Sequence, residues 1–435
     1  LALPRAKSWR LLRAPAPCAS TRGNGGGAGR SDRTVLGPST LLTSLARGLY
    51  RGAGAVLRRL GPYLAVRGRP PARVRRIVVA RMWAVGELVM ATPTLRTLRE
   101  AWPEARIDLL VGRSLAPLAQ GLPWIDEVLV VDEGPLLSAS PRAWIEATLR
   151  LRRRRYDVAV CLHQSALLGG LLWLGGARWR VGFDRGGEGF MHHVRVPCNV
   201  EGRHQVDEYL ETVRRLGFEP TSAVPSLHWD GNADARADAA LAPLIAAGKR
   251  TVIGLAPTGG DNVAASRLGT NVHLKRWPLS SYVDLARRLA ARPDVGVVVL
   301  GGPAEKEAGR EMGREVAGVL DLTGRLDLAT LAATCARLDV VVANDSGPMH
   351  VAAATGTRVL ALFGPTDQRL TGPFAPNARV LTHPVPCSPC FRRDTVPPSF
   401  PVCTHQRCLA ELSGARVANA VFAWLEEDGA ARPTG

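Results

Sequence analysis

From about residue 75 the chain alternates short apolar runs with longer segments of helical periodicity. The apolar runs of the first series predict strands at Ile77–Ala80, Ile107–Val111, Val128–Val131 and Val158–Leu162. Apolar positions at helical spacing predict a helix that follows the first strand and runs through Leu98, and another over Val206–Leu216. Residues 219–250 carry no strong pattern, so we place a crossover there.

A second series of the same kind follows. Its strands are expected at Val252–Ala256, Val295–Leu300, Val340–Ala343 and Val359–Phe363, and its helices at Leu279–Leu289, Pro303–Val316, Leu328–Ala336 and Met349–Ala354. Nearly continuous apolar strands that alternate with helices are typical of parallel sheets covered on both faces. We therefore predict an α/β protein with two Rossmann-like, doubly wound parallel-sheet domains that face a cleft, over residues 73–232 and 233–435.

The first 72 residues do not share this pattern. Residues 1–38 are rich in Arg, Pro and Gly, which predicts a disordered extension; a transit peptide or a misassigned start are the alternatives. Residues 39–67 interleave Leu and Arg, which indicates either a basic amphipathic helix on an anionic membrane surface or a helix packed on the body. The longest apolar run, near Leu167–Gly176, is too short to span a bilayer and predicts a buried helix.

The net charge of +18 suggests a nucleic-acid or membrane-surface binder, but the charge is uneven. Residues 1–76 contain 16 basic residues and one acid, a net charge of +15, which leaves +3 for the remaining residues. The nearly neutral body therefore gives no reason to expect a nucleic-acid partner.

Ligands of parallel α/β sheets bind outside the carboxyl ends of the strands. At one such end the sequence runs Asn344-Asp345-Ser346-Gly347-Pro348-Met349-His350 into a helix. Ser346 and Gly347 would present free N–H groups to a phosphate, Asp345 could bind a hydroxyl, and His350 could reach back over the site. The alternative is an ordinary helix cap formed by Asp345 or Ser346.

Two more turns follow strands of the second series, Gly301–Glu305 and Phe363–Asp367. Together with the first, they favour a nucleotide cleft. Lys275 and Arg276 precede Pro278 before a helix, where a cation could balance a diphosphate. Alternatively, this is a solvated basic turn with Pro278 as the first helical residue.

The first domain has a candidate site of its own after its first strand. Gly86 permits a tight turn, and Glu87 would stand at the helix start and face the cleft. A carboxylate held there could accept a proton from an acceptor hydroxyl. A first-turn Glu that complements the helix dipole is the alternative.

Four cysteines, Cys387, Cys390, Cys403 and Cys408, form a C-x2-C-x12-C-x4-C cluster in a proline-rich loop over residues 387–408. Four thiolates at this spacing can surround a zinc or iron ion, and His405 is a substitute ligand. Such a metal would be structural because protein atoms fill all four positions. Two disulfides or four free thiols are the alternatives.

These segments together resemble glycosyltransferase family nine, the lipopolysaccharide heptosyltransferases, from Arg75 to Leu412. The resemblance rests on the order and spacing of IVVARMWAVGELVMATP (77–93), LKRWP (274–278), GGPAEKE (301–307), LTG (322–324), NDSGPMH (344–350) and LFGPTD (362–367). It implies a GT-B fold and inverting sugar transfer, without a metal or other cofactor, from a nucleotide donor, typically ADP-heptose, to a lipopolysaccharide core acceptor.

The resemblance also implies roles for particular residues. The family's base is usually an Asp, and Glu87 stands at that position, while Trp83 replaces a small polar residue of the same loop. Lys275 would lie beside the diphosphate and act with Glu87 in catalysis. The implied donor-binding residues are Thr258, Lys275, Glu305, Asp345, Ser346, Gly347 and His350.

We therefore expect an inverting heptosyltransferase. The alternatives are a GT-B transferase or epimerase for another nucleotide sugar, or a non-catalytic nucleotide-sugar binder. The expected partners are a nucleotide-sugar donor, a lipid-linked glycan acceptor and an anionic membrane surface contacted through residues 39–67. This places the protein in the cytoplasm or on the inner face of the cytoplasmic membrane.

Overall fold

The computed structural model describes residues 66–137, 140–185, 187–198, 200–257, 259, 272–391, 403 and 405–431. The predicted extension, nearly all of the amphipathic segment 39–67, and Thr258 lie outside these residues. Within them, no helix is long and apolar enough to cross a bilayer.

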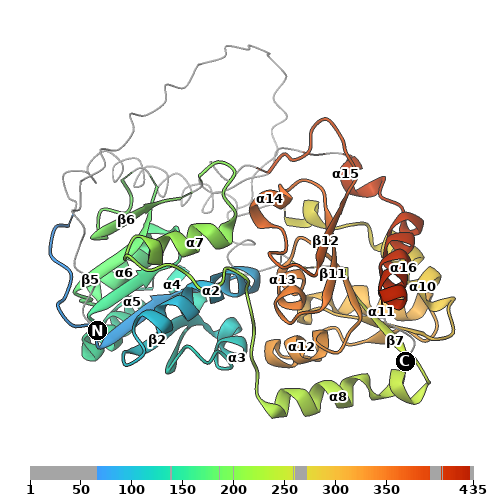
Figure 1. The fold of residues 1–435 in the computed structure, drawn as a ribbon, viewed down its shortest axis with the longest axis horizontal. Coiled ribbons are helices and arrows are strands. Elements are labelled where there is room, and N and C mark those ends of the chain that lie inside the picture. Colours follow the sequence, from blue (N-terminus) through green and yellow to red (C-terminus); the bar gives the residue numbers. More distant parts are fainter. Residues whose placement is uncertain are drawn as a thin grey trace, which may run out of the picture.

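Two six-stranded sheets with parallel pairing form the body of the protein, and they lie side by side in Figure 1. The N-terminal sheet has the order β3-β2-β1-β4-β5-β6, and Ile77 at its centre pairs with Ile107 and Val158. Its strands are β1 (Arg76–Ala80), β2 (Arg106–Gly112), β3 (Glu127–Val131), β4 (Val158–Cys161), β5 (Trp179–Asp184) and β6 (Val194–Pro197).

The C-terminal sheet has the order β12-β11-β10-β7-β8-β9, so β10 and β7 are central. Its strands are β7 (Thr251–Ala256), β8 (Val295–Val299), β9 (Leu320–Asp321), β10 (Val340–Asn344), β11 (Arg358–Phe363) and β12 (Ala378–Thr382). The predicted fold class is confirmed. The strands that sequence reasoning missed, β5, β6, β9 and β12, all lie at or next to a sheet edge, where polar residues interrupt the apolar pattern.

Helices cover both faces of the N-terminal sheet because side chains of a strand point alternately to its two faces. Ile77 and Val79 pack with α2 (Val85–Ala101), α3 (Ala116–Ala119) and α7 (Gln205–Arg214). Val78 and Ala80 pack with α4 (Glu133–Leu137), α5 (Pro141–Arg154) and α6 (Ala166–Leu174). Helices α4, α5 and α6 form an outer layer of the N-terminal half.

The C-terminal sheet is covered in the same way. Val341 and Ala343 face α12 (Leu328–Cys335) and α13 (Gly347–Ala354), and this core is continuous with that of α2 in the other half. Val340 and Val342 face α10 (Leu279–Ala290), α11 (Lys306–Glu315) and α16 (Gly414–Ala431). Figure 1 shows α2 and α13 adjacent where the two halves meet, and these helices are in contact.

Two expectations were wrong. Residues 219–250, which we expected to lack a pattern, contain helix α8 (Gly231–Ala246), capped by the Asp230 carboxylate, which accepts from the Ala233 N–H. The apolar face of α8 is rich in alanine, so its hydrophobic pattern is weak in the sequence. This face packs on α12. Helix α6 was expected to be buried, yet Leu167, Trp173 and Leu174 on it are more than two-fifths exposed.

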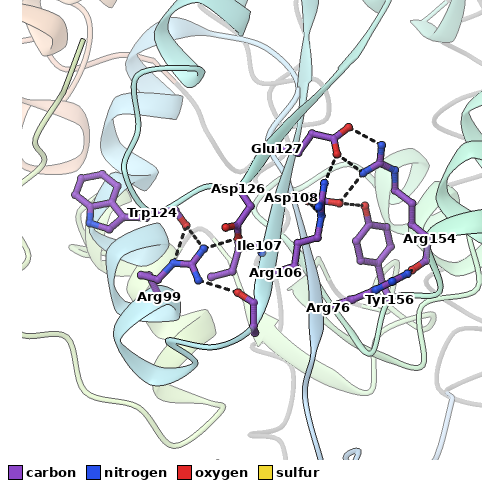
Figure 2. A network of polar contacts seen from close by, with 11 residues as sticks. Arg76, Arg99, Arg106, Ile107, Asp108, Trp124, Asp126, Glu127, Arg154 and Tyr156 are labelled. Atoms are coloured by element: carbon purple, nitrogen blue, oxygen red, sulfur yellow. Dashed lines mark hydrogen bonds and ion pairs between the residues drawn. The ribbon is translucent and has the colours of Figure 1, made fainter. Parts of the chain in front are cut away.

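A buried carboxylate on β2 joins two strands and a helix end (Figure 2). Asp108 is 1% exposed and accepts hydrogen bonds from the Tyr156 hydroxyl at 2.6 Å, Arg154 Nη1 at 3.0 Å and Arg106 Nε at 3.0 Å. Arg106 and Arg154 also pair with Glu127 on β3. Desolvation and the Asp108 hydrogen bond raise the pKa of Tyr156, so its hydroxyl stays protonated and donates.

We predict that Asp108→Ala lowers the free energy of unfolding by about 3 kcal/mol, because it leaves a buried hydroxyl and two cations without their shared acceptor. Tyr156→Phe removes only the donor and should cost about 1 kcal/mol. Urea denaturation followed by circular dichroism measures both. Equal costs for the two variants would contradict the assigned network.

Candidate active site

The start of α13 is the predicted anion site of the C-terminal half. Ser346 precedes the helix with an extended backbone (φ −153°, ψ 170°), and its hydroxyl donates to the Asn344 carbonyl at 3.2 Å instead of capping the helix. Of the two predicted capping residues, Ser346 therefore does not cap. The first-turn N–H groups of α13 carry the positive end of the helix dipole.

Lys275 and Asp345 meet at this helix start. The Lys275 ammonium donates to Asp345 Oδ2 at 2.8 Å, and the two side chains are 22% and 6% exposed. Lys275 ends the short 3-10 helix Val272–Lys275, and Pro278 lies one residue before the first residue of α10. Lys275 is therefore an anchored, largely buried cation, and the alternative of a solvated basic turn does not hold for it.

Asn344, to which we assigned no role, fixes the surrounding loops. Its amide donates to the Pro257 carbonyl at 2.7 Å, and its Oδ1 accepts from the Trp277 N–H at 3.1 Å and the Tyr282 hydroxyl at 3.2 Å. One buried side chain thus holds together the loop after β7, the segment after Lys275 and helix α10. In the sequence, the signal for this role was a single amide residue at the end of an otherwise apolar strand.

The start of α2 presents Glu87 from the other sheet. The Glu87 N–H donates to the carbonyl of Ala84, whose φ of 71° turns the chain sharply before the helix. The Glu87 side chain is 41% exposed and forms an ion pair with Arg81. The predicted position at a helix start is confirmed.

Arg81, which sequence reasoning missed, is the buried partner of this carboxylate. It is 2% exposed, donates from Nη1 to the Leu162 carbonyl at 3.0 Å, and lies 5.7 Å from the Tyr209 ring centroid. Burial lowers its pKa, while Tyr209 and Cys161 oppose that shift. A guanidinium this deep needs a counter-charge, and Glu87 supplies it.

The two helix starts lie against each other. A Cβ placed on Gly86 would approach His350 Cδ2 to 2.5 Å, and one placed on Gly347 would lie 3.1 Å from the Val85 Cβ. Burial is the main cause that lowers the pKa of His350 to about 4, with Lys275 and His204 adding to it and Asp345 opposing it. His350 is therefore neutral at pH 7 and fills the contact between the halves.

The remaining predicted donor residues are less closely tied to this group. Glu305 ends the 3-10 helix Pro303–Glu305 after β8, and a Cβ on Gly301 would lie 2.8 Å from the Glu305 Cβ. Within the part of the chain that the structure describes, no hydrogen bond or ion pair joins Glu305 to Lys275 or Asp345. Gly259, which follows Thr258, lies beside Ser346.

The four clustered cysteines line one hollow of about 10 Å³ together with His405, Leu274 and Gln406. All four are free thiols, so the disulfide alternative is not realised. Burial first, and then the neighbouring thiols, raise the pKa of Cys390, and the same causes raise that of Cys408 to about 11. As the side chains stand, no three His, Cys, Asp or Glu among the described residues have metal-ligand geometry.

Comparison with known proteins identifies the family. Residues 145–399, more than half of the chain, match the family model described as glycosyltransferase family 9 (heptosyltransferase). The chain belongs to glycosyltransferase family 9. It is therefore a glycosyltransferase of the heptosyltransferase family. The matched range includes the α13 site and Lys275 but begins after the Glu87 loop.

Two solved structures and one curated relative are similar to this family 9 chain. Lipopolysaccharide heptosyltransferase 2 of Escherichia coli strain K12 is 28% identical over 320 residues, which cover 70% of this chain and 87% of that protein. The structure of E. coli ADP-heptose lps heptosyltransferase II has a TM-score of 0.63 at 23% identity and covers 82% and 99% of the two chains. A family 9 glycosyl transferase from Veillonella parvula DSM 2008 has a TM-score of 0.61 at 25% identity, with 71% and 85% covered.

We predict that Gly86→Ala lowers the melting temperature, because the added methyl group must displace the buried His350 ring, at a cost of about 1–3 kcal/mol. Gly170→Ala is the matched control, since a Cβ there meets nothing within 4 Å on helix α6. The double variant Gly86→Ala/His350→Ala should lose less stability than the sum of the losses in the two single variants. Strict additivity in calorimetry would contradict the contact.

Proposed function

We propose that the enzyme transfers a heptose from ADP-heptose to a lipopolysaccharide core acceptor with inversion at the anomeric carbon. The observation that carries the proposal is the meeting of Gly86 and His350, because it brings a carboxylate from one sheet next to an anion site on the other. The names of the similar heptosyltransferases support the choice of sugar and acceptor. The proposal includes no cofactor in the transfer step.

In this proposal the donor binds at the start of α13. The N–H groups after Ser346 and Gly347 receive the diphosphate, and Lys275 stabilises the negative charge that develops as ADP leaves. Asp345 holds the Lys275 ammonium in place, at 2.8 Å, and can also bind a sugar or ribose hydroxyl. His350, kept neutral, packs beneath this group, while Thr258 and Glu305 contribute further donor contacts.

The acceptor binds on the Glu87 side, in the domain that we place at residues 73–232. The acceptor hydroxyl attacks the anomeric carbon from the face opposite ADP, and the Glu87 carboxylate accepts its proton. Arg81 forms an ion pair with Glu87 and so holds the carboxylate in place. Arg81 is thus a positioning residue for the base. Glu reaches about one methylene farther than the Asp usual in the family, which favours an acceptor held slightly farther from α2.

We predict that Glu87→Gln lowers kcat by about 100-fold or more while ADP-heptose affinity is kept, since only the proton acceptor is lost. Lys275→Met is the contrasting variant and should weaken ADP-heptose affinity about tenfold or more. Turnover is measured by mass spectrometry of a truncated core acceptor, and affinity by calorimetry. Unchanged turnover in Glu87→Gln would remove Glu87 from the mechanism.

The same assay separates the alternatives. Transfer from a different nucleotide sugar in a donor panel would replace the heptose assignment, and conversion of the donor without any acceptor would indicate an epimerase. Tight ADP-heptose binding with no transfer to any core acceptor would identify a non-catalytic binder.

We also propose that Cys387, Cys390, Cys403 and Cys408 hold a structural zinc or iron ion. The four thiols line one hollow, and four cysteine thiolates are a common ligand set for a structural zinc or iron ion. The loop touches the donor side, since the Gln406 side chain donates to the His273 carbonyl at 3.4 Å and Phe391 lies 5.6 Å from the Lys275 ammonium. A bound metal would therefore brace the segment that carries Lys275.

We predict that purified protein contains about one zinc or iron per chain and that Cys387→Ser removes it and lowers the melting temperature. Cys198→Ser, outside the cluster, is the control and should keep the metal. The raised pKa of Cys390 and Cys408 means that metal must displace protons, so apparent affinity should rise with pH. Elemental analysis that finds no metal in the unmodified protein would overturn the assignment.

The acceptor class bears on where the enzyme acts. A lipid-linked core acceptor is presented at a membrane, so we propose that the protein works at the inner face of the cytoplasmic membrane. In this proposal residues 39–67 are one contact with anionic lipid, supported by their alternating Leu and Arg residues.

A further inference from the structure

Exposed apolar side chains gather on one outer layer of the N-terminal half. Among the described residues, seven large apolar side chains are exposed, and five of them lie on α5 and α6. On α5 these are Ile145, 60% exposed, and Leu149, 46% exposed, one helical turn apart. On α6 they are Leu167, Trp173 and Leu174. We call these five residues and the arginines beside them the α5–α6 face.

The two helices present this face together. Ala147 and Leu151 of α5 and Leu168, Leu171 and Leu172 of α6 are buried against the same side of the sheet, so the exposed residues point away from it. Arg152 Nε donates to the Leu174 carbonyl at 2.7 Å and fixes the end of α6 against α5.

Its charge is positive. Residues 142–155 contain six arginines and one acid, Glu146, although residues 77–435 as a whole carry only +3. Arg142, Arg150 and Arg153 line the same surface hollow as Ile145 and Leu149, and Glu146 is the one acid that lines it with them. Among the ion pairs of the described residues, Arg154 alone of the six has a carboxylate partner. Most arginines elsewhere in the body, such as Arg287 with Glu315, are paired within the chain.

We propose that the α5–α6 face docks on an anionic phospholipid surface. Unpaired guanidinium groups complement lipid phosphates, while isolated apolar side chains and an indole are the groups that enter the interfacial layer of a bilayer. We therefore assign lipid as the binding partner of this face, because a lipid surface supplies both phosphate groups and apolar chains. This inference depends on the proposed function in one respect, namely that the acceptor is lipid-linked.

The position of the α5–α6 face is compatible with a lipid-linked acceptor that reaches Glu87. Both α5 and α6 begin at the carboxyl edge of the N-terminal sheet, the edge from which α2 and Glu87 also start. Trp83, four residues before Glu87, packs against the core beneath these helices. A bilayer on this face would present the head of a lipid-linked acceptor toward Glu87 without requiring the sheet to move.

The test uses the full chain and sedimentation with vesicles of phosphatidylcholine, alone or mixed with phosphatidylglycerol. Arg142→Glu/Arg153→Glu and Ile145→Ser/Leu149→Ser should each weaken binding to the mixed vesicles by about tenfold or more. Arg287→Glu and Ile245→Ser, equally exposed but outside the face, are the matched controls and should bind like the unmodified chain. Melting temperature and ADP-heptose affinity check that every variant stays folded and keeps its donor site.

A second readout follows Trp173 directly. Brominated lipids should quench part of the tryptophan emission of the unmodified chain, and Trp173→Phe should lose that part. Charge reversal of Arg47, Arg51, Arg58 and Arg59 tests the N-terminal segment in the same full chain.

Equal binding by the α5–α6 variants and the unmodified chain, with loss only in the N-terminal variant, would overturn the proposal. So would self-association abolished by Ile145→Ser/Leu149→Ser without vesicle binding, because it would assign the face to a second copy of the chain. Failure of transfer with vesicle binding intact would instead count against the proposed function alone.

Discussion

The close approach of two helix starts is the constraint on which the rest of the site depends. Gly86 and Gly347 have no side chains, so α2 and α13 can lie in contact at the junction of the two halves. The core continues through this contact, and His350 fills the remaining space as a neutral ring. A larger residue at Gly86 would push against the His350 ring and separate the start of α2, with Glu87, from the start of α13.

Charges around this junction are arranged as pairs because burial makes single charges costly. Arg81 faces Glu87 on one side, and Lys275 faces Asp345 on the other. In the proposed mechanism, each pair also places a group that takes part in the reaction, a carboxylate for the acceptor and a cation for the departing diphosphate. Asn344 keeps the second pair in register by hydrogen bonding to the loops on both sides of it.

Two features on the outside of the protein, the cysteine loop and the α5–α6 face, lie next to the site. The cysteine loop lies against the Lys275 segment, so a metal there would steady the donor side. The α5–α6 face lies behind the Glu87 loop, so a lipid surface there would serve the acceptor side.

The sequence by itself determined the central strands, the helix starts after them and the concentration of basic residues in residues 1–76, because these depend on local periodicity, turn residues and charge. It identified Glu87, Lys275 and the 344–350 segment as candidates. Only the tertiary structure decided that Arg81 is the buried partner of Glu87, that Asn344 joins two loop segments and helix α10, and that α6 exposes Trp173 and Leu174. These facts depend on contacts between residues far apart in the chain, and short-range patterns carry no information about such contacts.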